Sequence, residues 1–277
     1  MKLSQVGAQL YTVRDHLKDA TAFASTIDRI KGFGYCAVEL IHSETVNDQE
    51  IAKICGAAGV AVAAAHIPGE VILSRPDSVA EKLKTVGAKI AVYAFPRGVD
   101  FGSSLEVERL ANGLEQSAAF LAQEGLTLAY HNHAMEFARV GKELVYDVIR
   151  SRAPGLSFEL DAYWVQYGGM NPERWVRNLG DKLVSLHLKD FGVASKHGEV
   201  PFMTEVGQGN LDFQTLVADA ARGGCQWFIV EQDITPGDPF DSLEVSFQYV
   251  RDKLADPGAA FARPLKKRPS RLDMNAD

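Results

Sequence analysis

The sequence predicts a single (β/α)₈ barrel whose active site lies at the C-terminal ends of the strands. Three observations lead to this prediction: short apolar runs alternate with helix-like segments, eight of each can be placed along the chain, and several apolar runs end on a histidine or a carboxylate. A chain of 277 residues suits one such barrel. We expect the barrel to span residues 1–256 and a flexible tail to span 257–277.

The first half of the chain shows clear helix signals. The first helix places Phe23, Ile27 and Ile30 on one face, and glycine follows it. The next three helical patterns also stop at a glycine, a residue favoured just past a helix end. We expect strands over 6–11, 35–40, 60–66 and 89–95, and helices over 21–33, 46–58, 78–86 and 105–124.

The second half continues the alternation. Pro172 stands where the first turn of a helix tolerates proline. We expect strands over 126–133, 156–161, 183–189 and 226–231, and helices over 142–152, 171–179, 211–222 and 240–254. A doubly wound open sheet is the alternative, but GAQLYT, GYCAVE and GQGN match neither glycine-rich phosphate-binding pattern of that fold class.

Composition excludes several classes of function. The net charge is -7, and the main basic run, 263–271, lies in the tail, so nucleic acid is not an expected partner. Three widely spaced cysteines without a CxxC pair indicate neither a disulfide framework nor a thiolate zinc site. The absence of a signal-peptide core and of any long apolar stretch predicts a cytoplasmic protein that does not bind membranes.

Polar side chains follow four separate apolar runs. His131 and His133 end LTLAYHNH, Asp161 ends LSFELD, His187 lies in LVSLHLKD, and Glu231 lies in WFIVEQD. Parallel strands in a barrel deliver such residues to one rim. Helix capping or a salt bridge at the rim would explain any one of them, but their repetition favours a metal site. Nitrogen and oxygen donors without sulfur suit Mn²⁺, Mg²⁺, Co²⁺ or Zn²⁺.

Several of these segments carry a resemblance to a known family. On GAQLYTVRD, GYCAVEL, AAHIP, LAYHNHAMEF, SFELDAYW, VSLHLKD, EVGQGNLDF and IVEQD, the chain up to about Leu254 resembles the xylose isomerase-like TIM-barrel superfamily, in particular its sugar phosphate isomerase/epimerase branch. Members similar to ketose 3-epimerases hold a divalent cation with Glu, Asp, His and Glu from the fifth to eighth strands. The resemblance therefore implies Asp161, His187 and Glu231 as ligands, with manganese as the expected metal.

The chain departs from that pattern in two places. His131 stands at the fifth-strand position of the first ligand, and His133 or Glu136 could take that role instead. Trp164 stands where the epimerase-like pattern has a histidine, and we expect it to form a wall on which a sugar ring stacks.

Further residues are candidates for chemistry or for substrate contact. Each has a simpler alternative, such as a salt bridge at the rim for Glu39 or Lys189 and a structural hydrogen bond for His66. The catalytic candidates are Glu231, His131, Glu136 and Lys189, and the candidates for substrate binding are Glu39, His66, Trp164 and Tyr11.

The resemblance implies a metal-dependent isomerase or epimerase that removes a proton next to the carbonyl of a keto sugar and forms an enediolate. If the neighbouring carbon carries a leaving group, the same chemistry gives a lyase or dehydratase acting on inososes or 3-keto-glycosides. A non-catalytic sugar-binding barrel is a third hypothesis. The expected partner is a small carbohydrate. Homo-oligomers are common in that family, and the sequence does not select a state.

Overall fold

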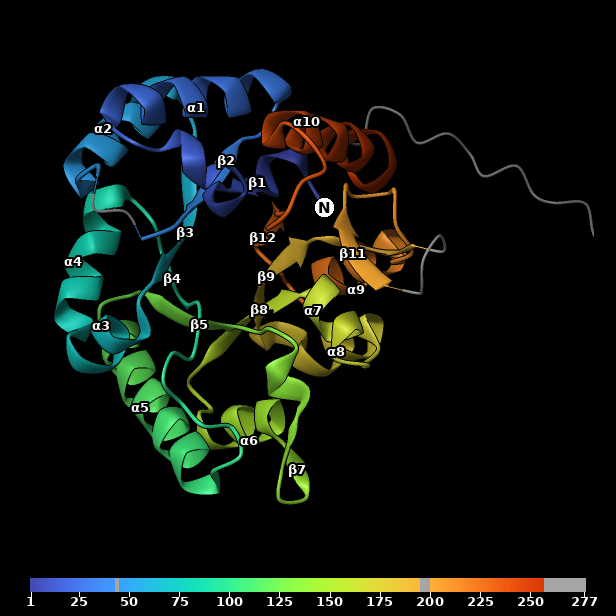
Figure 1. Ribbon diagram of the computed structural model, residues 1–277. Coiled ribbons are helices and arrows are strands. Elements are labelled where there is room, and N and C mark those ends of the chain that lie inside the picture. Colours follow the sequence, from blue (N-terminus) through green and yellow to red (C-terminus); the bar gives the residue numbers. More distant parts are fainter. Residues whose placement is uncertain (43–44, 195–199, 257–277) are drawn as a thin grey trace, which may run out of the picture.

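The computed structural model describes residues 1–42, 45–194 and 200–256. Eight parallel strands form a closed barrel in the order β1-β2-β3-β4-β5-β8-β9-β12, and β12 pairs back with β1. Helices surround the barrel (Figure 1). The prediction of one (β/α)₈ barrel is confirmed. The expected tail, 257–277, lies outside the described residues, so the boundary of the domain stays a prediction.

The barrel strands lie within the expected ranges, except that the third strand ends at Ile67 rather than at residue 66. The first ends at Gln9, because Leu10–His16 forms a 3₁₀ helix, and the fifth ends at His131 rather than residue 133. Lys189 and Glu231 therefore lie just past the paired strands. The strands are β1 (Val6–Gln9), β2 (Ala37–Leu40), β3 (Ala61–Ile67), β4 (Ile90–Tyr93), β5 (Thr127–His131), β8 (Ser157–Asp161), β9 (Leu183–Leu188) and β12 (Trp227–Val230).

All eight expected helices are present. They are α1 (Ala20–Phe33), α2 (Asp48–Ala58), α4 (Pro76–Val86), α5 (Ser104–Gln123), α6 (Val145–Arg152), α8 (Pro172–Leu179), α9 (Phe213–Arg222) and α10 (Pro239–Tyr249). The last one continues as a π-helical turn, Val250–Leu254. Two short helices at the C-terminal ends of strands, α3 (Gly69–Ser74) and α7 (Ala162–Tyr167), were not predicted.

Two hairpins interrupt the alternation. The expected helix start at residue 142 is wrong, because β7 (Glu143–Leu144) pairs with β6 (Arg139–Val140) across a turn in which Gly141 has φ of 63°. Glycine adopts this left-handed conformation without steric penalty. A second hairpin, β10 (Asp190–Ala194) with β11 (Val200–Thr204), follows β9 and was also not predicted.

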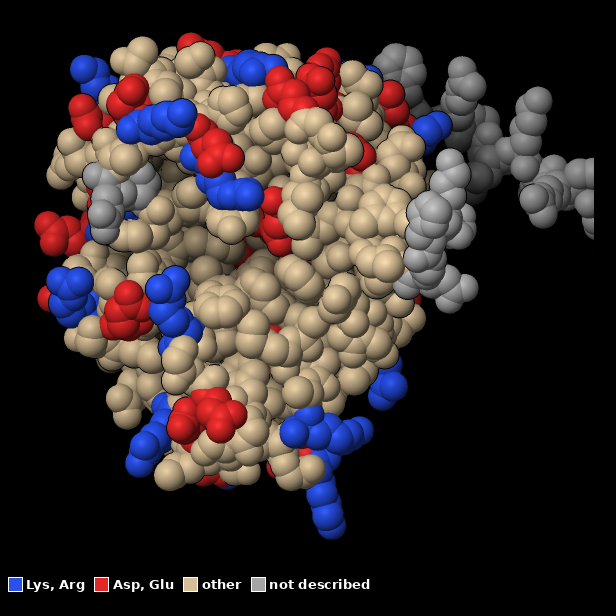
Figure 2. Space-filling model, in the orientation of Figure 1, with Lys and Arg blue, Asp and Glu red and all other residues tan. Residues whose placement is uncertain are grey.

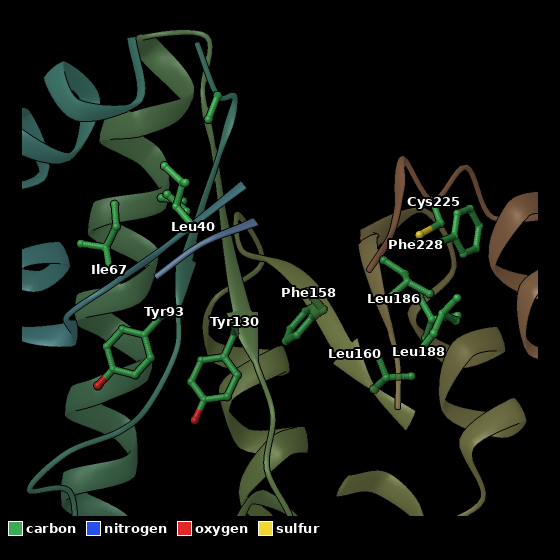
Figure 3. Close-up of a cluster of buried hydrophobic side chains, with 14 of the residues drawn as sticks. Leu40, Ile67, Tyr93, Tyr130, Phe158, Leu160, Leu186, Leu188, Cys225 and Phe228 are labelled. Carbon is green, nitrogen blue, oxygen red and sulfur yellow. The ribbon is translucent and has the colours of Figure 1, made fainter. Parts of the chain in front are cut away.

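Apolar packing forms two shells. Between strands and helices lie the larger side chains of Figure 3, among them the stacked rings of Tyr93 and Tyr130, whose centroids are 5.5 Å apart. Burying one such side chain stabilises the fold by about 1.5–3 kcal/mol. The barrel interior instead holds smaller clusters that include Ala37, Ala129 and Ile229. Because residues two apart face the same side of a strand, Glu39, His131 and Glu231 come next on the interior side.

No helix in the described part of the chain combines the length and the hydropathy that a membrane crossing requires.

Candidate active site

Strand register brings the polar interior residues into neighbouring pairs. Gln9 lies opposite Glu39, His131 opposite Glu159, and Asp161 opposite His187. Glu159 and Asp161 are two residues apart on β8, so both point into the barrel and Asp161 lies one layer nearer its C-terminal end. The barrel mouth is therefore lined by two successive polar layers.

The layer nearer the mouth contains the upper group, defined as His131, Asp161, His187 and Glu231. One donor atom from each lies within 4.8 Å of the others, and all four residues are buried. His187 Nδ1 is 3.0 Å from Glu231 Oε2 and 3.8 Å from Asp161 Oδ2. The four side chains come from four neighbouring strands of the barrel or the residue just after one.

A buried lysine lies beside the upper group. Lys189 Nζ is 2.6 Å from Glu231 Oε2, 3.0 Å from Asp161 Oδ2 and 2.9 Å from Asp233 Oδ1. Burial alone would lower the pKa of Lys189, but these three carboxylates raise it well above its ordinary value. The ammonium group therefore stays charged. Burial would raise the pKa of Glu231, and Lys189 and His187 hold it well below its ordinary value.

The deeper layer contains the lower group, defined as His66, His131, Glu159 and His187, whose donor atoms also lie within 4.8 Å of one another. Glu159 Oε1 is 2.8 Å from His66 Nε2, 3.1 Å from His131 Nδ1 and 3.0 Å from His187 Nε2. Three imidazoles thus surround one carboxylate oxygen. His131 and His187 belong to both groups.

Glu39 extends the lower group towards β1. Its Oε2 atom accepts a hydrogen bond from Gln9 Nε2 at 2.6 Å and lies 2.8 Å from His187 Nε2. Burial alone would lower the pKa of His66, but Glu39 and Glu159 raise it to about 10. The same two carboxylates and Glu231 raise the pKa of His187 well above its ordinary value against the effect of burial.

Backbone contacts fix the position of Asp161. Its Oδ1 atom accepts a hydrogen bond from the backbone N–H of Trp164 at 3.1 Å and so caps α7. The side chain of Asn132 accepts from the backbone N–H of Asp161 at 3.0 Å and donates to its carbonyl. The other carboxylate atom, Asp161 Oδ2, is buried and accepts no hydrogen bond, although the Lys189 ammonium is near it. One oxygen is thus held in place and the other is left available.

His133 lies among aromatic rings rather than among carboxylates. Its ring centroid is 5.3 Å from that of Phe95, 5.6 Å from Trp164 and 5.0 Å from His131. Burial, and then the neighbouring His131 and Lys189, lower the pKa of His133 to about 2. This imidazole is neutral and can donate or accept a hydrogen bond at the mouth.

The face of the molecule seen in Figure 2 is hollowed near the middle of the barrel. Acidic side chains are visible in the hollow, and mainly uncharged residues surround it. Tyr11 and Phe95 are 41% and 47% exposed, which leaves both rings accessible to a ligand. The guanidinium group of Arg14 lies 4.4 Å from the centre of the Tyr11 ring and donates to two backbone carbonyls.

Glu136 lies apart from both groups of donors. Its carboxylate accepts from the Tyr130 hydroxyl at 2.9 Å and from the backbone N–H of His133 at 2.8 Å. Burial raises the pKa of Glu136 to about 7. In this structure the residue anchors the segment that follows β5.

Sequence reasoning anticipated most of this constellation. Seven of the residues it singled out meet in or beside the two groups: Glu39, His66, His131, Asp161, His187, Lys189 and Glu231. It missed Glu159, Asn132 and Asp233. The signal for Glu159 was its position two residues before Asp161, and the signal for Asp233 was its position two residues after Glu231, since both spacings are those of a shared strand face.

The residues of the upper group fit a divalent cation. They offer carboxylate oxygens and imidazole nitrogens, which suit Mg²⁺, Mn²⁺, Co²⁺ or Zn²⁺. Asp161 Oδ2 supports this fit, because it is buried and accepts no hydrogen bond, and the Lys189 ammonium near it is shared with Glu231 and Asp233. The candidate metal site therefore rests on the donor set and on this atom.

Comparison with known proteins agrees with the architecture. The family model described as "Xylose isomerase-like TIM barrel" matches residues 27–253. The chain belongs to this family. A sugar phosphate isomerase/epimerase from Parabacteroides distasonis ATCC 8503 superposes with a TM-score of 0.76 at 17% identity, over 91% of this chain and 95% of that one. L-ribulose 3-epimerase superposes with a TM-score of 0.68 at 12% identity, over 91% and 94%. At these identities the two structures show a shared fold.

Among curated proteins the chain is similar to the inosose dehydratase of Clostridium botulinum (strain Alaska E43 / Type E3). The two are 25% identical over 161 residues, which is 52% of this chain and 53% of the relative. The match spans about half the length of that relative.

Proposed function

We propose that this protein is a divalent-metal-dependent sugar isomerase or epimerase that removes the proton next to the carbonyl of a keto sugar. The observation that carries the proposal is the upper group: four nitrogen and oxygen donors, from neighbouring strands, converge beside a buried ammonium group at the mouth of the barrel. The family to which the chain belongs and its sugar phosphate isomerase/epimerase neighbours support this choice.

The ligands in this proposal are His131, Asp161, His187 and Glu231, with manganese as the preferred ion and Mg²⁺, Co²⁺ or Zn²⁺ as substitutes. When bound, such an ion acts as a Lewis acid on the substrate carbonyl and makes the adjacent C–H more acidic. The chain itself supplies the remaining functions, which are proton transfer, charge balance and orientation of the sugar.

Glu231 is the proposed base for the α-proton. Lys189 and His187 hold its pKa low, so the carboxylate is ionised before substrate arrives. Lys189 keeps its own proton because the surrounding carboxylates raise its pKa, and its role is to stabilise negative charge that develops on substrate oxygen. His131 is a ligand in this proposal, and its other nitrogen faces Glu159, so it does not transfer a proton to the substrate. Glu231 itself returns the proton to the neighbouring carbon, which gives an isomer.

The aromatic residues at the rim complete the site in this proposal. Trp164 and Tyr11 would stack on the apolar face of the sugar, and the neutral His133 would bond a hydroxyl. The nearby cation Arg14 is already bonded to two backbone carbonyls. We therefore favour a sugar or keto sugar without phosphate.

A lyase acting on an inosose or a 3-keto-glycoside is the second candidate. Two observations favour it: the curated relative is an inosose dehydratase, and the fifth strand supplies His131 where a two-carboxylate proton shuttle would need a second carboxylate. In elimination one group can take the α-proton and hand it to the leaving hydroxyl, so no donor is needed on the opposite face of the substrate. Water leaves and a carbon–carbon double bond forms.

Hydrogen exchange distinguishes these proposals. The protein, loaded with Mg²⁺ or Mn²⁺, is incubated in D₂O with ketoses, inososes and 3-keto-glycosides, beside an EDTA-treated sample and Asp161→Asn, and the cleared reaction is read by NMR. Metal-dependent deuterium uptake at the α-carbon supports the proposal. An epimer or isomer identifies the first candidate, and loss of water or of an aglycone identifies the second. Absence of both exchange and product formation with every substrate would contradict both candidates and favour a binding protein.

A further inference from the structure

Glu159 has no assigned role, although it is fully buried at the centre of the lower group. Its Oε1 atom has an imidazole nitrogen from each of His66, His131 and His187 within 3.1 Å. It lies one layer deeper than Asp161 on the same strand, so it faces the back of the candidate ligands rather than the mouth. A residue in this position acts through the histidines.

The two shared histidines present different nitrogen atoms to Glu159. His187 directs Nε2 towards Glu159 and Glu39, which leaves Nδ1 next to Glu231 and Asp161. His131 directs Nδ1 towards Glu159, so Nε2 is its remaining nitrogen. The lower group therefore distinguishes the two nitrogens of each ring.

A ligating histidine needs one bare nitrogen, and it normally donates the other N–H to a carboxylate or carbonyl that fixes its tautomer. We propose that Glu159 is a positioning residue that holds His131 as the Nδ1–H tautomer and His187 as the Nε2–H tautomer. His131 then presents Nε2, and His187 presents Nδ1, to a divalent cation in the upper group. This inference rests on the proposed metal site. Opposite tautomers of the two histidines are its specific consequence.

The alternative use of the lower group is as a second cation site. The two groups share both His131 and His187, so two ions bound at once would require both rings to use both of their nitrogens as ligands. Each ring would then have lost both N–H protons. A hydrogen-bonded carboxylate requires only the ordinary neutral imidazole.

His66 completes the arrangement without entering the upper group. It lies parallel to His187, with centroids 5.8 Å apart, and contacts Glu39 at 3.3 Å as well as Glu159 at 2.8 Å. It thus bridges the two deep carboxylates and restrains both from the side of β3. This contact holds His66 in place, with its side chain 12% exposed.

The experiment compares the wild-type protein with Glu159→Gln, which keeps the volume of the side chain but removes its charge. Asp219→Asn is the matched control, because Asp219 is a buried carboxylate on α9 that pairs with Arg177, away from the barrel interior. Each protein is titrated with Mn²⁺ and Zn²⁺ by calorimetry. Long-range ¹H–¹⁵N spectra of histidine-labelled, Zn²⁺-loaded protein report which nitrogen of each ring carries a proton. Replacement of each of the 7 histidines in turn assigns the signals.

We expect wild-type protein and Asp219→Asn to bind one ion per chain and to show opposite tautomers for His131 and His187. Glu159→Gln should bind the ion about 10–100-fold more weakly and lose the fixed tautomers. Unchanged affinity and tautomers in Glu159→Gln would overturn the inference. Two ions per chain in wild type and one in the variant would also overturn it, in favour of a second cation site.

Failure of the metal proposal itself gives a different result. If wild-type protein binds neither ion, the function proposed above is wrong. The imidazole N–H protons of the metal-free protein, observed in H₂O, then test the contact alone. Protected N–H signals that Glu159→Gln removes and Asp219→Asn keeps would support hydrogen bonding by Glu159, and their absence in wild type would exclude it.

Discussion

The upper and lower groups inside the barrel differ in the cations that balance their carboxylates. In the upper group, Asp161 and Glu231 face the ammonium group of Lys189, which cannot readily give up its charge. In the deeper layer, Glu159 of the lower group and the neighbouring Glu39 face imidazoles instead. The upper group thus has a fixed positive charge beside the proposed metal site, whereas imidazoles balance the carboxylates of the deeper layer.

Among the described residues, Lys189 is the one buried lysine or arginine, whereas several carboxylates are buried nearby. Buried carboxylates must be paired, protonated or bound to a cation. Lys189 balances part of this negative charge, and His66 and His187, whose pKa values the carboxylates raise, balance more of it. This difference yields four predictions, beginning with the largest effect.

Removing a ligand of the upper group should have the largest effect. Asp161→Ala and Glu231→Ala should each weaken Mn²⁺ binding by more than about 100-fold. Loss of a residue that only orients a ligand weakens metal binding by about 10–100-fold, and loss of a ligand itself should cost more. Calorimetric titration and metal analysis after dialysis measure this. Full metal occupancy in both variants would show that the constellation does not bind the ion.

Lys189→Met should come next. In metal-free protein it leaves buried carboxylates without their partner and should lower the free energy of unfolding by about 3–5 kcal/mol. Divalent cation should then stabilise the variant more than the wild type, because the ion replaces the lost positive charge. Thermal melts with and without Mn²⁺ test this, and equal stabilisation of both proteins by the ion would contradict it.

Glu136→Gln tests a buried carboxylate outside both groups. Because the folded-state pKa of Glu136 is raised from 4.5 to about 7, the unfolded state releases this proton first as pH rises, and wild-type stability falls across that interval. The difference in the free energy of unfolding between Glu136→Gln and wild type should therefore shift by about 3 kcal/mol in favour of the variant between pH 4.5 and pH 7. Urea unfolding at several pH values measures it. A constant difference between the two proteins would show that the pKa is not raised.

Lys84→Met should have the smallest effect. Lys84 on α4 pairs with Glu124, which directly follows α5, and their side chains are 54% and 40% exposed. Exposed pairs of this kind contribute less than about 1 kcal/mol because solvent screens them. The same urea experiment, run beside Lys189→Met, compares one substitution in two environments. A loss as large as that of Lys189→Met would remove the contrast between buried and exposed charge.

The fold was accessible from sequence because its signals are local. Apolar runs, helix periodicity and stop signals such as Gly59 and Gly87 each depend on a few neighbouring residues, and all eight barrel strands and the eight helices between them were found. The errors also have local causes. Gly141 turns the chain into a hairpin where helix was expected, and Leu10 to His16 coils into a 3₁₀ helix directly after β1.

The candidate site was only partly accessible. A polar residue that ends an apolar run, such as Asp161, His187 or Glu231, can be recognised without neighbours in space. Glu159 is harder to recognise: its spacing from Asp161 indicates a shared strand face, but its importance comes from three histidines on other strands. For the same reason the sequence left open whether His131, His133 or Glu136 faces the ligand site. The identity of the residues that bind the metal stays a prediction.

The sequence by itself determined the order of the eight barrel strands and the eight helices that follow them, and most of the polar residues at the mouth, since these follow from backbone preference and hydrophobic periodicity. Only the tertiary structure decided which nitrogen of each histidine faces which carboxylate, and that Lys189 lies between Asp161, Glu231 and Asp233. Those relations depend on barrel closure and strand register, which bring together residues far apart in the chain.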